Sequence, residues 1–93
     1  MKVVNKYKDV YDVYIGRGSK WGNPFKIGAY NSDTHKSPMT RALVISMYEE
    51  YIRDDEILMA SLHELDGKVL GCFCKPKACH GDVLVKLRKE QLI

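Results

Sequence analysis

The stretch from Cys72 to Asp82 gathers the residue types that most often bind metals, hold anions or act as nucleophiles. Within it, Cys79, His80 and Gly81 precede an apolar segment typical of a helix, so we expect them at a helix N-terminus. Free backbone amides and the helix dipole at such a terminus favour an anion and lower the pKa of a nearby thiol. His80 could donate to a phosphate or transfer a proton, whereas Asp82 is expected to cap the helix. The stretch therefore predicts an anion site, with His80 and Cys79 as its candidate catalytic residues.

The same stretch contains four soft side chains that could bind zinc, namely Cys72, Cys74, Cys79 and His80. Their spacing argues against zinc, because two cysteines one residue apart point to opposite faces of a strand and adjacent residues rarely reach one ion. As a third alternative, the cysteines are small buried apolar side chains, which suits Cys72 in an apolar strand. As part of a ligand site, Cys74 ends this strand beside Cys79 and His80. We therefore expect no cofactor and keep zinc as the open alternative.

A second motif is the glycine-rich segment from Gly16 to Phe25, which has three glycines and a proline in ten residues. Glycines let backbone amides approach a ligand closely, and arginine can hold a phosphate through two parallel hydrogen bonds. The single tryptophan, Trp21, could stack on a base or lie in the core, and Phe25 is expected in the core. The segment matches neither the dinucleotide fingerprint nor the Walker P-loop. Its candidate ligand-binding residues are Arg17, Gly18, Ser19, Lys20, Trp21 and Asn23, to which the other motif adds Cys74, Cys79, His80 and Gly81.

Strands are predicted where β-branched and aromatic residues gather, at Val3–Val4 and at Asp9–Ile15. The continuous apolar run of Lys68–Cys74 predicts a buried central strand. The glycine-rich segment thus follows a strand, and the cysteine motif lies at the end of another. In open α/β sheets this is where ligands bind.

Helices are predicted from apolar residues at helical spacing. The first is expected to begin with Ser37 as its cap and Pro38 in its first turn. A shorter helix follows and ends near Gly67, and a third begins after His80. The apolar positions of the first two helices are Val44, Tyr48, Tyr51 and Ile52, then Leu58, Leu62 and Leu65.

The chain has 93 residues, which is the size of one domain, so we expect a single α/β domain over residues 1–93. The predicted fold is a sheet of about three strands with three helices in a Rossmann-like sandwich. No apolar run reaches the roughly 18 residues of a membrane span, and the N-terminus lacks the apolar core of a signal peptide. We therefore expect a cytoplasmic protein that does not enter a membrane.

Charge is distributed unevenly along the chain, although the net charge is only +3. Residues 1–30 hold six Lys or Arg and two Asp or Glu, residues 31–66 hold three and eight, and residues 67–93 hold six and two. The two basic thirds contain the two motifs, which suits a phosphate-bearing ligand. The excess is too small to favour general nucleic-acid binding.

The two motifs, IGRGSKWGNPF at Ile15–Phe25 and CFCKPKACHGD at Cys72–Asp82, occur in this order in the chain. Together they resemble a family of small phage and bacterial proteins, the domain of unknown function 4326. The resemblance covers the chain from about Val13 to Leu87, and Arg41 and Tyr48 also look like family positions. It implies phage-linked roles such as nucleotide or DNA metabolism or counter-defence, and it supplies no catalytic assignment.

These observations predict a pocket between the Gly16–Phe25 loop and the Cys74–His80 turn for a nucleotide or a nucleotide-derived phosphorylated ligand. In a phage, such a protein could sequester a nucleotide immune signal in the host cytoplasm. One alternative is a minimal enzyme that acts on a nucleotide N-glycosidic or phosphate bond. Another is a zinc-stabilised module that binds a host protein or nucleic acid. A homo-oligomer stays open, because the tyrosine-rich first helix could form a dimer seam as readily as a core.

Overall fold

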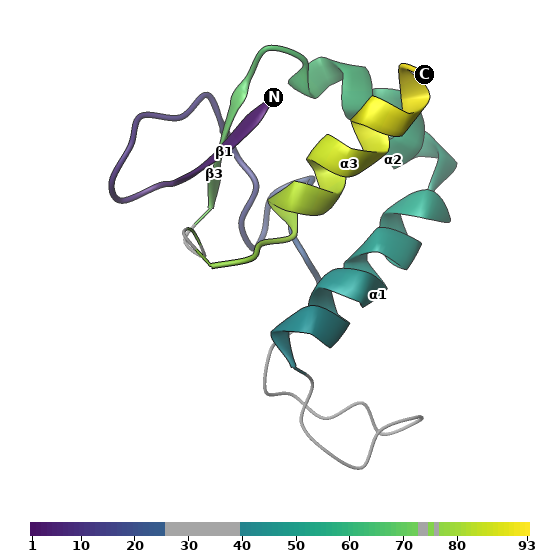
Figure 1. Ribbon diagram of the computed structural model, residues 1–93, viewed down its shortest axis with the longest axis horizontal. Helices are drawn as coiled ribbons and strands as arrows, with labels where there is room; N and C mark the ends of the chain where they lie inside the picture. The colour runs from purple at the N-terminus through teal and green to yellow at the C-terminus, as the bar shows by residue number, and fades with distance from the viewer. Residues whose placement is uncertain (26–39, 73–74, 76) are drawn as a thin grey trace.

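The computed structural model describes residues 1–25, 40–72, 75 and 77–93. Strands and helices occur in the predicted order, and a short 3-10 helix (η1) follows the second helix (Figure 1). The elements are β1 Lys2–Asn5, β2 Val13–Tyr14, α1 Arg41–Arg53, α2 Glu56–Ser61, η1 Leu62–Leu65, β3 Val69–Cys72 and α3 Gly81–Gln91. The α/β class is therefore confirmed.

The three described strands form a parallel sheet in the order β1-β3-β2. Lys2 pairs with Val69 on one side of β3, and Val13 pairs with Leu70 on the other. β3 is the central strand, as its apolar run predicts, and Leu70 is fully buried. Because β1 and β2 are parallel and not adjacent, the segment of residues 6–12 must run back past β3 to connect them.

The ring of Tyr11 lies against the backbone of β3 at Gly71. A methyl group placed on Gly71 would lie 2.5 Å from Cγ of Tyr11, so the close approach of this ring depends on the missing side chain. The return segment is thereby held to the sheet without a helix.

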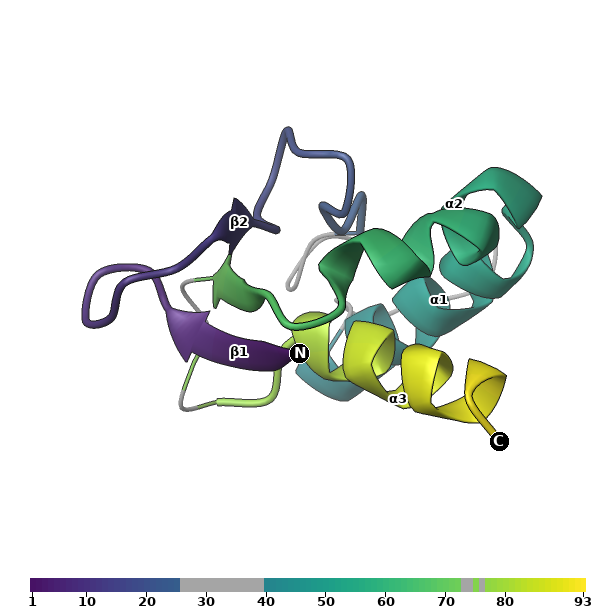
Figure 2. The same ribbon diagram turned by 90° about the horizontal axis from the view of Figure 1, so that it is seen from above.

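All three α-helices lie on the same side of the sheet, as a second view shows (Figure 2). Apolar side chains from the helices and strands form the core between them. The N-terminus of α3 approaches the sheet closely, since a methyl group on Gly81 would lie 2.7 Å from Cδ1 of Ile15. The fully buried core side chains are Tyr48, Ile15, Ile52, Leu62, Leu65, Leu70, Leu84 and Leu87, together with Cys72 and Cys79.

Two of the predicted boundaries are wrong. The predicted strand at Asp9–Ile15 is reduced to Val13–Tyr14, because β3 begins at Val69 and offers no partner to residues before Asp12. The first helix begins at Arg41, not at Ser37–Pro38, because the hydroxyl of Thr40 accepts a hydrogen bond from the amide of Leu43 at 3.1 Å and caps the helix.

Other predictions agree with the described residues. Gly67 ends the second helical region with a φ of +73°, a conformation that glycine adopts at little cost. The Rossmann-like arrangement stays a prediction, since the described helices cover one side of the sheet. Ser37, Pro38 and the end of the predicted strand at Phe73–Cys74 lie outside the described residues. Among the helices that the structure describes, none is long and apolar enough to cross a membrane.

Candidate functional site

A pocket lies where the two sequence motifs meet, and we call it the inter-motif pocket. Its volume is about 180 Å³. The glycine-rich loop forms one wall, the start of α1 forms another, and the end of β3 with the residues before α3 forms the third. Its lining residues are Gly16, Arg17, Asn23, Phe25, Arg41, Val44, Ile45, Cys72, Ala78, Cys79 and His80. Residues 56 to 64 positions apart in the sequence thus contribute to one concave site.

His80 lies in the wall of this pocket and is only 9% exposed. Its Nε2 is 2.6 Å from the carbonyl oxygen of Ile15, at the end of β2. A carbonyl can only accept, so Nε2 carries the hydrogen, and Nδ1 is an acceptor in the neutral ring. Burial lowers the pKa of His80 below its ordinary value of 6.5, which favours this neutral form. The edge of the ring also packs on Tyr48, with ring centroids 4.9 Å apart.

Two thiols lie beside His80. Cys72 and Cys79 are each 1% exposed, and their sulfur atoms are 2.9 Å apart. The Sγ of Cys79 is 3.7 Å from Nδ1 of His80 and accepts a hydrogen bond from the amide of Gly81 at 3.4 Å. The prediction that Cys72 is a buried small side chain is confirmed, and Cys79 and His80 do lie at the start of a helix.

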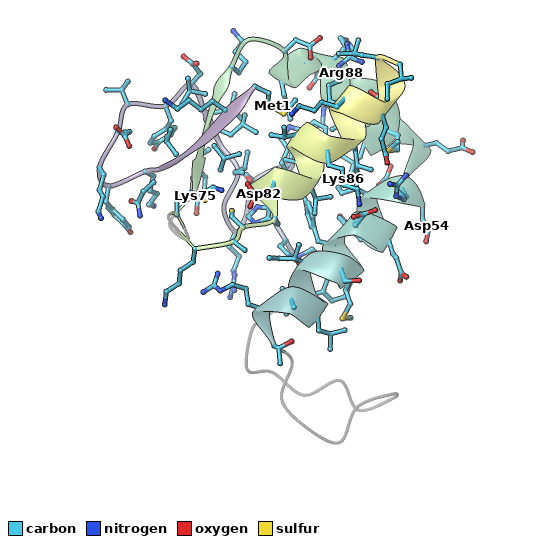
Figure 3. All side chains as sticks on the ribbon, in the orientation of Figure 1. Met1, Asp54, Lys75, Asp82, Lys86 and Arg88 are labelled. Atoms are coloured by element: carbon cyan, nitrogen blue, oxygen red, sulfur yellow. The ribbon has the colours of Figure 1, made fainter. Side chains whose placement is uncertain are left out.

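Asp82 holds the residues before α3 in place. Its carboxylate accepts a hydrogen bond from the amide of Cys79 at 3.1 Å. It also forms an ion pair with the ammonium group of Lys75 at 2.6 Å (Figure 3). His80, not Asp82, is the N-cap residue of α3, so Asp82 holds the start of the helix by reaching back from its first turn to the amide of Cys79. The hydrogen bond that Lys75 donates to the carboxylate of Asp82 raises the pKa of Lys75 above its ordinary value. Asp82 is thus committed to the backbone and to Lys75, and it does not line the pocket.

Two arginines bring positive charge to the pocket. Arg17 is exposed in the glycine-rich loop, and Arg41 lies in the first turn of α1. Nη1 of Arg41 donates to the carbonyl oxygen of Ala78 at 3.0 Å, which joins α1 to the cysteine motif. No Asp or Glu is among the lining residues that the structure describes. The resemblance to the family singles out Arg41 without giving it a role. The structure shows that Arg41 lines the pocket.

Several predicted ligand-binding residues lie elsewhere. Trp21 is 3% exposed in the core, so the predicted stacking on a base does not fit its position. Lys20 forms an ion pair with Glu64 at 2.9 Å and lies over the indole of Trp21, outside the pocket lining. Gly18 has a φ of +87° and permits a turn there. These residues shape the loop instead of facing the pocket.

Ser19 and Gly81 also have structural contacts in place of the predicted ligand contacts. The hydroxyl of Ser19 donates to the carbonyl oxygen of Gly16 at 2.6 Å, which closes the turn. Gly81 is buried where α3 approaches the sheet and is not part of the pocket lining. The amide of Gly81 donates a hydrogen bond to Sγ of Cys79, which does line the pocket.

Asn23 and Phe25 do line the pocket. Asn23 donates to the carbonyl oxygen of Val44 at 3.3 Å and accepts from the amide of Phe25 at 2.9 Å, so its side chain fastens the loop to α1. Phe25 was expected in the core, but it is half-buried at the pocket and packs edge-on against Tyr51. An aromatic side chain thus faces the pocket, although it is not the predicted one.

Within the ranges that the structure describes, no three His, Cys, Asp or Glu side chains are arranged to hold a metal ion. Cys74, the fourth candidate ligand for zinc and a predicted member of the ligand site, lies outside those ranges. The zinc alternative therefore stays a prediction.

The fold and pocket define a small α/β protein whose parallel sheet carries a basic pocket beyond the carboxyl ends of its strands. The chain belongs to the family described as Domain of unknown function (DUF4326), whose family model matches residues 2–90. It is 40% identical over 90 residues to a protein of Enterobacteria phage T4 described as "Uncharacterized 12.4 kDa protein in nrdA-td intergenic region". That match covers 92% of this chain and 75% of the phage T4 protein. No solved structure matches the chain. The predicted family and its link to phages are confirmed.

Proposed function

We propose that the chain binds a nucleotide or a nucleotide-derived phosphorylated ligand in the inter-motif pocket. The observation that carries the proposal is the composition of the pocket lining. Arg17 and Arg41 supply two positive charges, and the described lining has no carboxylate to neutralise them. A pocket of this kind favours an anionic ligand.

The guanidinium groups suit phosphate in particular. Arginine presents five N–H donors in a planar fork and can bind two phosphate oxygens at once. Arg41 uses one donor for Ala78, a contact that holds its guanidinium at the pocket. Arg17 is exposed in the wall that the glycine-rich loop forms, so its guanidinium is available to a phosphate bound in the pocket.

The rest of the lining suits a flat, partly apolar group. Phe25, Val44 and Ile45 form an apolar surface, and the aromatic ring of Phe25 could pack against a base. The volume of about 180 Å³ is below the roughly 300–1,000 Å³ of pockets that bury whole drug-sized ligands. We therefore expect the described walls to enclose only part of a nucleotide, with the remainder outside the pocket mouth.

A binding role is better supported than turnover. The carboxylate of Asp82 is held by Lys75 and by the amide of Cys79, and it lies outside the pocket lining. His80 donates to Ile15 and has a lowered pKa. Because the relative from phage T4 links the family to phages, we extend the proposal to sequestration of a nucleotide signal of host immunity.

Isothermal titration calorimetry of the purified full chain tests the proposal by measuring binding affinities. The probes are AMP, ADP-ribose and a cyclic dinucleotide, and adenosine is the unphosphorylated control. We expect at least one phosphorylated probe to bind, and Arg17→Ala to weaken its binding roughly tenfold or more. Loss of one hydrogen bond to a charged group costs about 1.5–3 kcal/mol.

Lys20→Ala is the matched control, because it removes the same charge from the same loop at a position outside the pocket. We expect it to change the affinity less than twofold. Equal losses in Arg17→Ala and Lys20→Ala would mean that binding is general electrostatic attraction. If no phosphorylated probe binds more tightly than adenosine, the phosphate assignment is wrong.

A further inference from the structure

The buried thiols of Cys72 and Cys79 have no part in the proposed ligand binding, yet they lie in the wall of the same pocket. We propose that they form a redox-active pair, which a peroxide converts to an intramolecular disulfide and a thiol reductant restores. The proposal rests on the geometry of the two residues and does not depend on the identity of the ligand.

The first observation is the contact between the two sulfur atoms. Cys72 lies at the end of β3 and Cys79 just before α3, and their sulfurs are 2.9 Å apart. A disulfide has an S–S bond of about 2.05 Å, so bond formation needs the sulfurs to move together by less than 1 Å. Both side chains belong to the pocket lining, which gives a small oxidant a path to residues that are otherwise buried.

The surroundings single out Cys79 as the thiol that reacts first. Its Sγ accepts a hydrogen bond from the amide of Gly81 at the start of α3, an interaction that stabilises a thiolate. Its Sγ is also 3.7 Å from Nδ1 of His80, the nitrogen that carries no hydrogen because Nε2 donates to Ile15. His80 can therefore take up the thiol proton. Cys72 lies in contact with Cys79 and is placed to act as the resolving thiol.

The reaction is balanced with hydrogen peroxide as the oxidant. The thiolate of Cys79 attacks one peroxide oxygen, the O–O bond breaks, and a sulfenic acid forms with release of hydroxide. The thiol of Cys72 then attacks the sulfenic sulfur, the S–S bond forms, and water leaves. The displaced hydroxide takes up the proton first removed from Cys79. In sum, two thiols are oxidised by two electrons, and one peroxide is reduced to two molecules of water.

The short sulfur contact also separates this proposal from a zinc site. Two cysteine ligands of one tetrahedral zinc ion lie about 3.8 Å apart, given Zn–S bonds of about 2.3 Å. The sulfurs of Cys72 and Cys79 are closer than this. In a reducing cytosol a disulfide of this kind is transient, as redox-sensing disulfides are.

Mass spectrometry of the purified full chain tests the proposal. We expect one equivalent of hydrogen peroxide to lower the intact mass by two hydrogen atoms and dithiothreitol to restore it. Trypsin cuts after Lys77 but not after Lys75, which precedes proline, so the two sulfurs lie on separate peptides. Fragmentation of the linked peptides shows whether Cys79 is joined to Cys72 or to Cys74.

Cysteine variants test the same disulfide without relying on the tryptic digest. Cys74→Ser is the matched control and should still form the link, whereas Cys72→Ser should accumulate a sulfenic acid on Cys79 that dimedone traps. Thermal unfolding of each reduced variant verifies that it is folded. A link through Cys74, a link between two chains, no oxidation at one equivalent of peroxide, or a bound zinc ion in the native mass spectrum would each overturn the proposal.

Discussion

Replacing Tyr48 by phenylalanine isolates the hydrogen bond that connects α1 to the glycine-rich loop. Tyr48 is fully buried, and its hydroxyl donates to the carbonyl oxygen of Trp21 at 2.6 Å. Burial raises the pKa of Tyr48 well above its ordinary value of 10.0, so the phenol stays a neutral donor at any working pH. The substitution keeps the ring and removes only the hydroxyl that donates to the carbonyl of Trp21. Trp21 is itself buried, with 3% of its surface exposed.

The expected cost follows from this burial. Leaving a buried acceptor without its donor costs about 1–3 kcal/mol of folding free energy. Because phenylalanine keeps the packing of the ring, we expect Tyr48→Phe to destabilise the chain by about 1.5 kcal/mol. Urea unfolding followed by circular dichroism measures this directly. With a slope of about 1.5 kcal/mol per molar urea, the midpoint should fall by roughly 1 M. The fluorescence of Trp21, the single tryptophan, should report the same transition.

Tyr51 supplies the control on the same helix. Tyr51 is 38% exposed, and Tyr51→Phe removes the same hydroxyl oxygen from a position that is more exposed to solvent. We expect a change within about 0.5 kcal/mol, as is usual for surface substitutions. The reasoning is refuted if both substitutions shift the midpoint equally, or if Tyr48→Phe leaves it unchanged.

Three further predictions concern the sheet, the buried histidine and the start of α3. Gly71→Ala should destabilise the chain by about 1–3 kcal/mol, because its methyl group would overlap the ring of Tyr11, and adding Tyr11→Ala should recover most of the loss in thermal unfolding. Burial lowers the pKa of His80, so just below pH 6.5 the unfolded chain binds more protons than the folded chain. The free energy of unfolding should therefore fall as the pH drops from about 7 to 5, and His80→Gln should make this dependence on pH weaker. An unchanged slope in the variant would assign the effect to other groups. Asp82→Ala should cost about 1 kcal/mol in urea unfolding, because the amide of Cys79 loses its acceptor, whereas Asp82→Asn should cost less; equal costs would contradict the role of this hydrogen bond.

The sequence predicts the elements better than it predicts their extent. The apolar run around Leu70 predicts the central strand, since a strand with neighbours on both sides is typically buried. The length of β2 depends on its partner, and no propensity of residues Asp9–Asp12 reveals that β3 begins at Val69. The start of α1 depends on which residue with a capping side chain is used, and in the structure the hydroxyl of Thr40 accepts the hydrogen bond from the amide of Leu43.

For the candidate site, the sequence identifies the motifs but not which of their side chains face the pocket. A tryptophan among polar residues is compatible with stacking on a ligand and with burial, and only the packing around Trp21 distinguishes them. The lining role of Arg41 depends on the position of α1 relative to Ala78, a contact between residues 37 positions apart. The tautomer of His80 depends on the carbonyl of Ile15, which nothing near His80 in the sequence reveals.

The central position of β3 has a consequence for how the chain folds. Lys2 pairs with Val69 and Val13 with Leu70, so each side of the sheet closes a loop of roughly 60 residues. Closing such a loop costs about 3.5 kcal/mol of chain entropy before any strand contact forms, and long-range parallel pairing is intrinsically slow. During synthesis, β1 and β2 have no neighbour in the sheet until Cys72 has left the ribosome. The helices α1, α2 and η1, which follow one another in the chain and contact their neighbours, are therefore expected to form first and to present a surface on which the three strands and α3 assemble.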